Sequence, residues 1–244
     1  MKIKLVIHYD GTRFMGWQRQ PGKLTIQGKI EDALYKLYHR NLKIYGASRT
    51  DAGVHAKGQV AHFIAPITGA PPKNLAHKIN PYLPSDIRIR SAEKVADDFH
   101  ARESARSKRY EYVILNHPHE ISTSLHLWWV THPLDIVPMN EACQYLLGSH
   151  DFSSFQSSGS HSPTPIREIF EAFWKREKDH VIFTIRGSGF LKFMVRNLVG
   201  TLTLVGQKKI TPLDFKAILE KKNRSDAGAT APACGLTLIE ICYA

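Results

Sequence analysis

Apolar and polar residues follow two different periods near the start of the chain. In KIKLVIHY (residues 2–9), the apolar side chains from Ile3 to Ile7 occupy every second position, which predicts a β-strand. In TIQGKIEDALYKLYHR (residues 25–40), the apolar residues recur at helical spacing, and Thr25 is a suitable N-cap. We therefore predict a strand followed by an amphipathic helix, and a last strand at LTLIEICY (residues 236–243).

The same patterns predict further strands and helices between these ends. The predicted strands are LKIYGA (42–47), QVAHFI (59–64), IRIRSA (87–92), RYEYVIL (109–115), LWWV (127–130), FEAFWKR (170–176) and HVIFTIRG (180–187). The predicted helices are PPKNLAHKIN (71–80), MNEACQYLLG (139–148) with Gly148 as its stop, GFLKFMVRNLVGTLTLVG (189–206) and TPLDFKAILEKK (211–222). A long polar loop is predicted at 154–167. Because both halves combine antiparallel-type strands with one or two helices, the predicted fold class is α+β.

The composition is that of a folded, soluble protein. Of 244 residues, 43% are hydrophobic and 23% are charged. No stretch approaches the ~20 continuous apolar residues that span a bilayer, and the short apolar run at the start lacks a secretory pattern. We expect a cytoplasmic protein with no membrane partner. The three cysteines form no CxxC pair and are expected to be core residues, so no disulfide scaffold or zinc site is predicted.

The formal net charge of +11 is concentrated in the first half of the chain. Residues 1–122 hold 20 Lys or Arg and 11 Asp or Glu, whereas residues 123–244 hold 13 and 11. Excess positive charge favours a polyanionic partner, since binding phosphates releases condensed counterions. A nucleic-acid partner is therefore one possibility. The other is that the protein is basic but binds no acidic partner.

The segment GASRTDAGVHAKGQVAHF (residues 46–63) is the most polar part of the predicted sheet. It places Asp51 beside Arg49 on a glycine-rich loop between two apolar runs. One interpretation is a simple Asp-Ala-Gly turn with a solvated arginine. The other is a catalytic carboxylate beside a cation, since catalytic groups concentrate on loops that a rigid sheet supports.

Within this segment, SRTDAGVHAKGQV resembles the signature motif of the tRNA pseudouridine synthase A family. The blocks YDGTRFMGWQRQPGKLTIQGKIEDAL, NPYLPSDIRI, DDFHARESARSKRYEY, GFLKFMVRNLVGTLTLVG and APACGLTLIEICY are similar to other blocks of that family, in the same order. The resemblance implies isomerisation of uridine to pseudouridine at positions 38, 39 and 40 of the tRNA anticodon stem-loop. It also implies a homodimer and no cofactor or metal.

The resemblance assigns site residues at four positions. The catalytic aspartate falls on Asp51, the uracil-stacking tyrosine on Tyr110, and the active-site basic residues on Arg49 and Arg196. From the pattern alone, Tyr110 is typical of a core residue of its strand, and Arg196 could equally be a solvated or ion-paired helix residue.

These residue types suit the reaction. It breaks the N1–C1′ bond, turns the uracil and joins C5 to C1′ without net redox change. A carboxylate that attacks as a nucleophile or removes a sugar proton is required, and both routes stay open for Asp51. A flat aromatic ring that stacks on an extruded base contributes about 1–3 kcal/mol to the binding free energy.

Basic side chains around these positions are candidates for contacts to the RNA backbone. They are Arg13, Arg19, Lys57, Arg102, Arg106, Lys108 and Arg109. The chain departs from the family pattern at Glu103, Pro163, Lys192 and Phe193, which concerns local packing and some backbone contacts.

The resemblance also refines the predicted architecture. It implies two similar ferredoxin-like halves with antiparallel sheets that meet at a central basic cleft. Residues 1–115 carry the aspartate, and residues 116–244 complete the cleft.

The residues also allow two other functions. One is a non-catalytic RNA-binding module, and the other is a glycoside hydrolase with Asp10 and Asp51 as paired carboxylates, which would lie ~5–9.5 Å apart.

Overall fold

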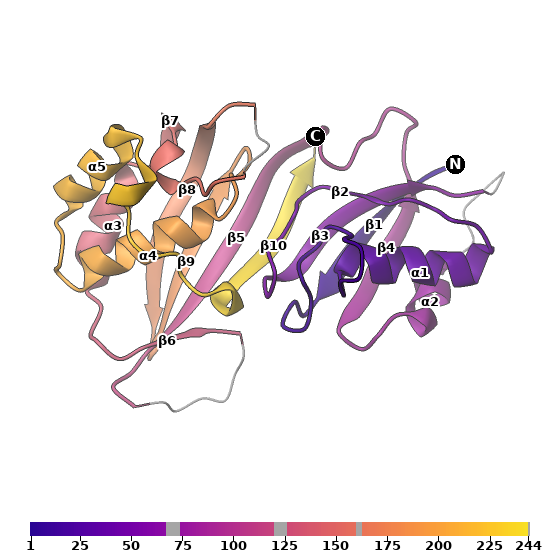
Figure 1. The fold of residues 1–244 in the computed structure, drawn as a ribbon, viewed down its shortest axis with the longest axis horizontal. Helices are drawn as coiled ribbons and strands as arrows, with labels where there is room; N and C mark the ends of the chain where they lie inside the picture. The colour runs from indigo at the N-terminus through magenta and orange to yellow at the C-terminus, as the bar shows by residue number, and fades with distance from the viewer. Residues whose placement is uncertain (67–73, 120–125, 160–162, 244) are drawn as a thin grey trace. The chain divides into compact units, whose positions relative to one another are not determined.

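The computed structural model describes most of the chain. The described residues are 1–66, 74–119, 126–159 and 163–243. They form two compact units (Figure 1): unit 1 is Met1–Arg106 with Thr237–Ala244, and unit 2 is Ser107–Leu236. The C-terminal strand thus groups with the N-terminal segment, which a division between residues 115 and 116 does not anticipate. The order of elements along the chain does not reveal this grouping, because the grouping depends on the pairing of the C-terminal strand with a strand of the N-terminal segment.

Unit 1 is a mostly antiparallel sheet with helices. Its strands are β1 (Lys2–Tyr9), β2 (Tyr45–Gly46), β3 (His55–Ile64), β4 (Ile87–Lys94) and β10 (Leu236–Tyr243). Its helices are α1 (Ile26–Tyr38) and α2 (Leu75–Ile79), followed by the 3-10 turn η1 (Asn80–Tyr82). β1 lies between β4 and β3 and is antiparallel to both, whereas β3 also pairs with β2 antiparallel and with β10 in parallel.

The core of unit 1 follows the predicted periods. Every second side chain of β1 from Ile3 to Tyr9 is buried, which confirms the period of two. Helix α1 begins after Thr25, whose side-chain oxygen accepts the Gly28 N–H at 3.3 Å, as predicted. It ends at a left-handed His39 and buries the apolar stripe that the sequence predicts.

The strands of unit 2 are also mostly antiparallel. Its strands are β5 (Ala105–Asn116), β6 (Trp128–Val130), β7 (Gly148–Asp151), β8 (Ile166–Glu177) and β9 (His180–Gly187). Its helices are α3 (Ile136–Gln144), α4 (Met194–Gly206) and α5 (Pro212–Lys221), with 3-10 turns η2 (Ser153–Phe155), η3 (Arg224–Asp226) and η4 (Ala233–Gly235). The order is β5-β9-β8-β7, all antiparallel, and β6 joins β5 in parallel. The strands β8 and β9 and the helix α5 confirm the sequence prediction; β8 and β9 form a hairpin, and α5 begins with a capping box at Thr211.

Several predicted elements have different bounds in the structure. The helix predicted over 189–206 begins only at Met194, because Phe193 before it is left-handed, with φ 60°. The helix predicted over 139–148 instead covers Ile136–Gln144, and Gly148 starts β7 rather than ending the helix.

The strand predicted over 42–47 shortens to Tyr45–Gly46, because only these residues pair with β3. Pro71 and Pro72, the predicted helix start, lie outside the described residues, and α2 begins at Leu75.

The fold is α+β with mostly antiparallel strands, as predicted. In the described part of the chain, no helix combines the length and apolar character needed to cross a membrane.

Candidate active site

Residues 47–54 form a loop between β2 and β3 in unit 1. Asp51 is half-buried, and its carbonyl oxygen accepts the Val54 N–H at 3.2 Å, which closes a four-residue turn. Gly53, the third residue of that turn, has φ +79°, a left-handed conformation that glycine adopts without strain. The predicted Asp-Ala-Gly turn is therefore present, and Asp51 is its first residue.

Backbone hydrogen bonds fix this loop along its length. The Ala47 N–H donates to Val60 O at 2.8 Å, and the Gly53 N–H donates to Phe14 O at 3.2 Å. Between them, Thr50 O accepts the Trp17 N–H at 3.0 Å. This approach needs glycine at position 16, where a Cβ atom would lie 2.6 Å from Thr50 O. The loop therefore presents Asp51 from a fixed backbone, as a catalytic carboxylate requires.

Arg49 and Arg102 are two cations near each other in unit 1. Both side chains are exposed. Loss of hydration and then the charge of Arg49 lower the pKa of Arg102, while Glu103 raises it. Two neighbouring positive charges favour an anion between or beside them. This pair is therefore suited to binding an anionic group, and Arg49 itself belongs to the loop 47–54.

Asp10 has a local structural role. Its Oδ1 accepts the Thr12 N–H at 2.9 Å and the Thr12 hydroxyl at 2.6 Å, which is an Asx-type turn. The same oxygen lies 3.2 Å from Nδ1 of His55, and that nitrogen accepts the Gly11 N–H at 3.1 Å. Through these bonds, Asp10 forms the turn that follows β1.

Tyr110 lies on β5 in unit 2, opposite Ile185 of β9. Its side chain is 5% exposed and packs edge-on against Phe190, with ring centroids 5.2 Å apart at 86°. An edge-to-face partner fixes the plane of the ring. A ring in a fixed plane can support base stacking, and the same packing also suits a core residue.

Arg196 occupies the first turn of α4 in unit 2. Its Nε donates to Ala231 O at 2.7 Å, and the Ala231 N–H donates back to Arg196 O at 3.1 Å. The guanidinium carbon lies 4.8 Å from the centroid of the Phe193 ring. Phe193, one of the departures from the family pattern, thus forms a cation–π contact with Arg196. The plane of the guanidinium is fixed on two sides.

The predicted RNA-backbone residues differ in their ion pairs. Arg13 donates from Nε to Asp86 at 2.8 Å, and Arg19 lies 2.9 Å from Glu31. Arg109 lies 3.4 Å from Glu171. Lys57, Arg102 and Arg106 are exposed.

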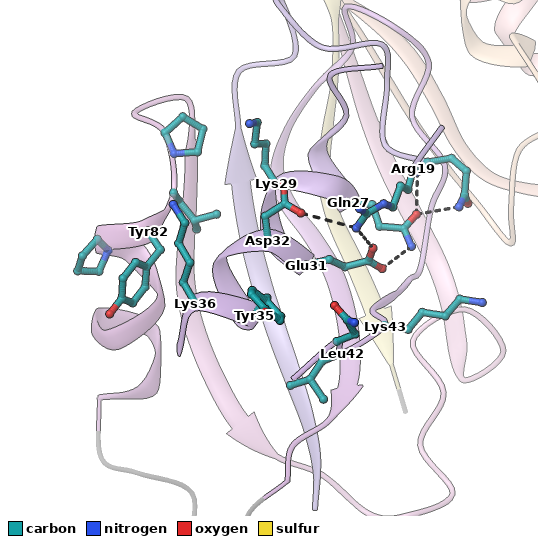
Figure 2. Close-up of a pocket in the computed structure, with 15 residues that line it drawn as sticks. Arg19, Gln27, Lys29, Glu31, Asp32, Tyr35, Lys36, Leu42, Lys43 and Tyr82 are labelled. Atoms are coloured by element: carbon teal, nitrogen blue, oxygen red, sulfur yellow. Dashed lines mark hydrogen bonds and ion pairs between the residues drawn. The ribbon is translucent and has the colours of Figure 1, made fainter. Parts of the chain in front are cut away.

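Unit 1 also has a hollow that the sequence did not predict, termed the α1 hollow. It has a volume of about 1120 Å³ and lies along α1, the segment after α1 and the η1 turn (Figure 2). Arg19 lies on its wall beside Glu31 and Asp32, and the Arg19–Glu31 hydrogen bond raises the pKa of Arg19. Of the residues that the structure describes, none from the loop 47–54 lines it.

Sequence reasoning missed several residues that support these groups. Gln59 and Tyr9 are buried and hydrogen-bond the segment that carries Asp51. The buried Asn197 bonds α4, which carries Arg196, to Phe155 O. The one signal in the sequence is a polar residue at a position where the period of the strand or helix calls for an apolar one.

Comparison with known proteins identifies the family. A sequence model described as tRNA pseudouridine synthase matches residues 5–102 and 142–244. The chain is 46% identical over 242 residues to the tRNA pseudouridine synthase A of Acetivibrio thermocellus, covering 99% of both. It is 43% identical over 246 residues to that of Bacillus pumilus, covering 100% of this chain and 99% of the relative.

Among solved structures, a chain of a Cbf5-Nop10-Gar1 complex aligns with 96% of this chain and 57% of its own length. Its TM-score of 0.37 and 10% identity are too low to support a conclusion. The family match and the full-length relatives are sufficient: this chain belongs to the tRNA pseudouridine synthase family, isomerases that convert uridine to pseudouridine in tRNA.

Proposed function

We propose that this protein forms pseudouridine at positions 38, 39 and 40 of the tRNA anticodon stem-loop, with Asp51 as the catalytic residue. The observation that carries the proposal is a half-buried carboxylate on a loop whose backbone is hydrogen-bonded to Phe14, Trp17 and Val60, in a chain of this family. A carboxylate on a fixed loop can attack C1′ or remove a sugar proton without first reorganising.

Three further residues act with Asp51 in this proposal. Arg49 and Arg196 keep the carboxylate ionised and orient it, since a nearby guanidinium favours the charged form. Tyr110 stacks on the extruded uracil, and its edge-on contact with Phe190 supports a fixed ring plane. Exposed cations hold the RNA backbone, and Lys57, Arg102 and Arg106 are the leading candidates.

The proposal includes the architecture and assembly that the resemblance implies. Two ferredoxin-like halves meet at a central basic cleft, and the enzyme is a cytoplasmic homodimer. In unit 1, the order β4-β1-β3-β2, with α1 after β1 and α2 after β3, supports the ferredoxin-like plan. Sedimentation equilibrium tests the dimer: a single species of monomer mass at micromolar concentration would contradict it.

Release of tritium tests the catalytic assignment. Unmodified tRNA labelled with tritium at uridine C5 is incubated with the wild type, Asp51→Asn and Asp32→Asn. The reaction replaces the C5–H bond by C5–C1′, so each turnover releases one tritium to water. We expect at least about a 10³-fold lower rate for Asp51→Asn. Asp32 is an exposed carboxylate in the α1 hollow, so the control variant Asp32→Asn should retain the wild-type rate.

Two results would separate the alternatives. Equal tritium release by the wild type and Asp51→Asn would reject Asp51 as the catalytic residue. Binding of tRNA without any release by the wild type would favour the non-catalytic RNA-binding module. Chemical mapping of pseudouridine in the product then tests positions 38, 39 and 40 one by one.

A further inference from the structure

The side chain of Gln59 is the centre of a buried hydrogen-bond network in unit 1. Gln59 lies on β3 opposite Ile7 and is 0% exposed, at a position where the strand pattern calls for an apolar residue. Its Oε1 accepts the N–H groups of Ser48 and Val60, both at 3.2 Å. Its Nε2 donates to Ser48 O at 2.7 Å and to the Tyr9 hydroxyl at 3.4 Å. All four bonds that a carboxamide can form are therefore made.

Tyr9 extends this network to the residue before Asp51. The Tyr9 hydroxyl is buried and lies 2.7 Å from the Thr50 hydroxyl. Nε2 of Gln59 can only donate, so the Tyr9 hydroxyl oxygen accepts the hydrogen bond from it. The Tyr9 hydroxyl proton is then available to donate to the Thr50 hydroxyl. A continuous chain of bonds thus links Gln59, through Tyr9, to Thr50.

The network fixes backbone and side chain on both sides of Arg49. Gln59 binds both the N–H and the C=O of Ser48, which sets the orientation of two successive peptide planes. Thr50 is held through its hydroxyl by Tyr9 and through its carbonyl by Trp17. Asp51 follows directly, so a rotation at Thr50 would move its carboxylate.

An apolar residue at position 59 would fill the same place in the sheet without the desolvation penalty of a buried carboxamide. The penalty is offset only if every bond is made, and a fully bonded network specifies one backbone conformation. What this network specifies is the conformation of residues 48–50. Catalytic groups need placement within about 0.5 Å of the productive geometry.

We infer that Gln59 and Tyr9 are positioning residues for the Asp51 carboxylate, acting through Ser48 and Thr50. This inference rests on the proposed catalytic role of Asp51. Loss of the network should lower the rate of the chemical step and leave tRNA affinity nearly unchanged, since neither residue is exposed to the substrate.

Single-turnover tritium release at saturating enzyme measures the chemical step, and filter binding measures tRNA affinity. Tyr9→Phe removes only the hydroxyl and should lower the rate about tenfold or more, with the tRNA Kd within twofold of the wild type. Thr50→Val should have a similar effect, and Thr50→Ser, which keeps a hydroxyl, should recover most of that rate.

Tyr243→Phe is the matched control. It removes a hydroxyl in the same unit that donates to Ala101 O at 2.7 Å, outside the network, and it should keep the wild-type rate. A Tyr9→Phe rate within twofold of the wild type would overturn the inference, as would a loss that Thr50→Ser shares in full with Thr50→Val.

The controls also separate this inference from the proposed function. An inactive Asp51→Asn with a fully active Tyr9→Phe rejects only the positioning role. An active Asp51→Asn rejects both. If Tyr9→Phe fails to fold, the comparison of Thr50→Val with Thr50→Ser decides the question alone.

Discussion

The two units hold their candidate functional side chains in different ways. In unit 1, Asp51 belongs to a loop, and the conformation of that loop depends on hydrogen bonds from distant residues such as Gln59 and Trp17. In unit 2, Arg196 belongs to a helix, and α4 itself fixes the position of its backbone. A group on a loop needs outside support to hold its position, whereas a group on a helix does not.

Each unit nevertheless contains a fully buried amide side chain near its candidate residue. Asn197 in unit 2 is 0% exposed; its Nδ2 donates to Phe155 O at 2.8 Å, and its Oδ1 accepts the Thr230 hydroxyl at 2.6 Å and Arg224 Nη2 at 3.1 Å. It ties two loops to the helix, whereas Gln59 orients the loop that carries Asp51. The same type of group should therefore control stability in unit 2 and the reaction rate in unit 1.

The largest expected effect is on the stability of unit 2. Asn197→Leu leaves the Thr230 hydroxyl and an Arg224 guanidinium without their acceptor, so the free energy of unfolding should fall by about 4 kcal/mol. Urea denaturation followed by circular dichroism measures this change. The rate per folded molecule, from single-turnover tritium release, should stay within about threefold of the wild type.

Gln59→Met should lower the single-turnover rate per folded molecule more than Asn197→Leu does. If both variants lose rate equally once corrected for the folded fraction, the distinction between loop and helix support is wrong.

Arg196→Lys should give the next largest effect. Lysine keeps the positive charge but lacks the Nε–H that donates to Ala231 O and the plane that stacks on Phe193. We expect about a 10²-fold lower single-turnover rate, with tRNA affinity within about threefold. Phe193→Leu, which removes the ring but keeps the guanidinium, should lose less than tenfold. A fully active Arg196→Lys would mean that charge alone suffices there.

Much of the fold could be predicted from periodicity because most elements carry their own pattern. The alternation in β1, the capped helix α1 and the hairpin β8–β9 depend on side chains within each segment. The start of α4 could not be predicted, because residues 189–193 are as apolar as the helix. The left-handed Phe193 reflects tertiary packing, including its contact with Arg196.

Only those candidate-site residues that lie within a sequence motif could be predicted. A family motif identifies Asp51 and Arg49 directly. It does not reveal that Gln59 bonds Ser48, 11 residues away, or that Tyr9 bonds Thr50, 41 residues away. Such long-range hydrogen bonds leave only one trace in a sequence, a polar residue at an apolar position.

Acid should destabilise unit 1 through His62. This side chain is buried against Tyr45, and its Nδ1 accepts the Ala101 N–H at 3.1 Å. Burial, and then the charges of His100 and Lys2, lower its pKa to about 4. Between pH 6.5 and 4 the unfolded chain binds this proton and the folded chain does not, so stability falls as the pH falls through that window.

The expected loss is on the order of 2 kcal/mol, and hydrogen exchange read by mass spectrometry at pH 6.5 and pH 4.5 locates it. Peptides from β3 and from residues 99–104 should lose protection before peptides from α4. His62→Gln should reduce this difference. Equal loss in both units for both proteins would show that His62 is not responsible.

The smallest expected effect compares one exposed cation of unit 1 with one ion-paired cation of unit 2. Lys57 is exposed on β3, and no salt bridge joins it to another residue in the described part of the chain. Arg109 on β5 lies 3.4 Å from Glu171. If Lys57 contacts a phosphate, Lys57→Ala should weaken tRNA binding about threefold to fivefold and lower the slope of log K against log salt by about one. Arg109→Ala should change the Kd less than twofold, since Glu171 already neutralises that charge. The reverse order would mean that the salt bridge opens on binding and that the RNA contacts of unit 2 are the stronger ones.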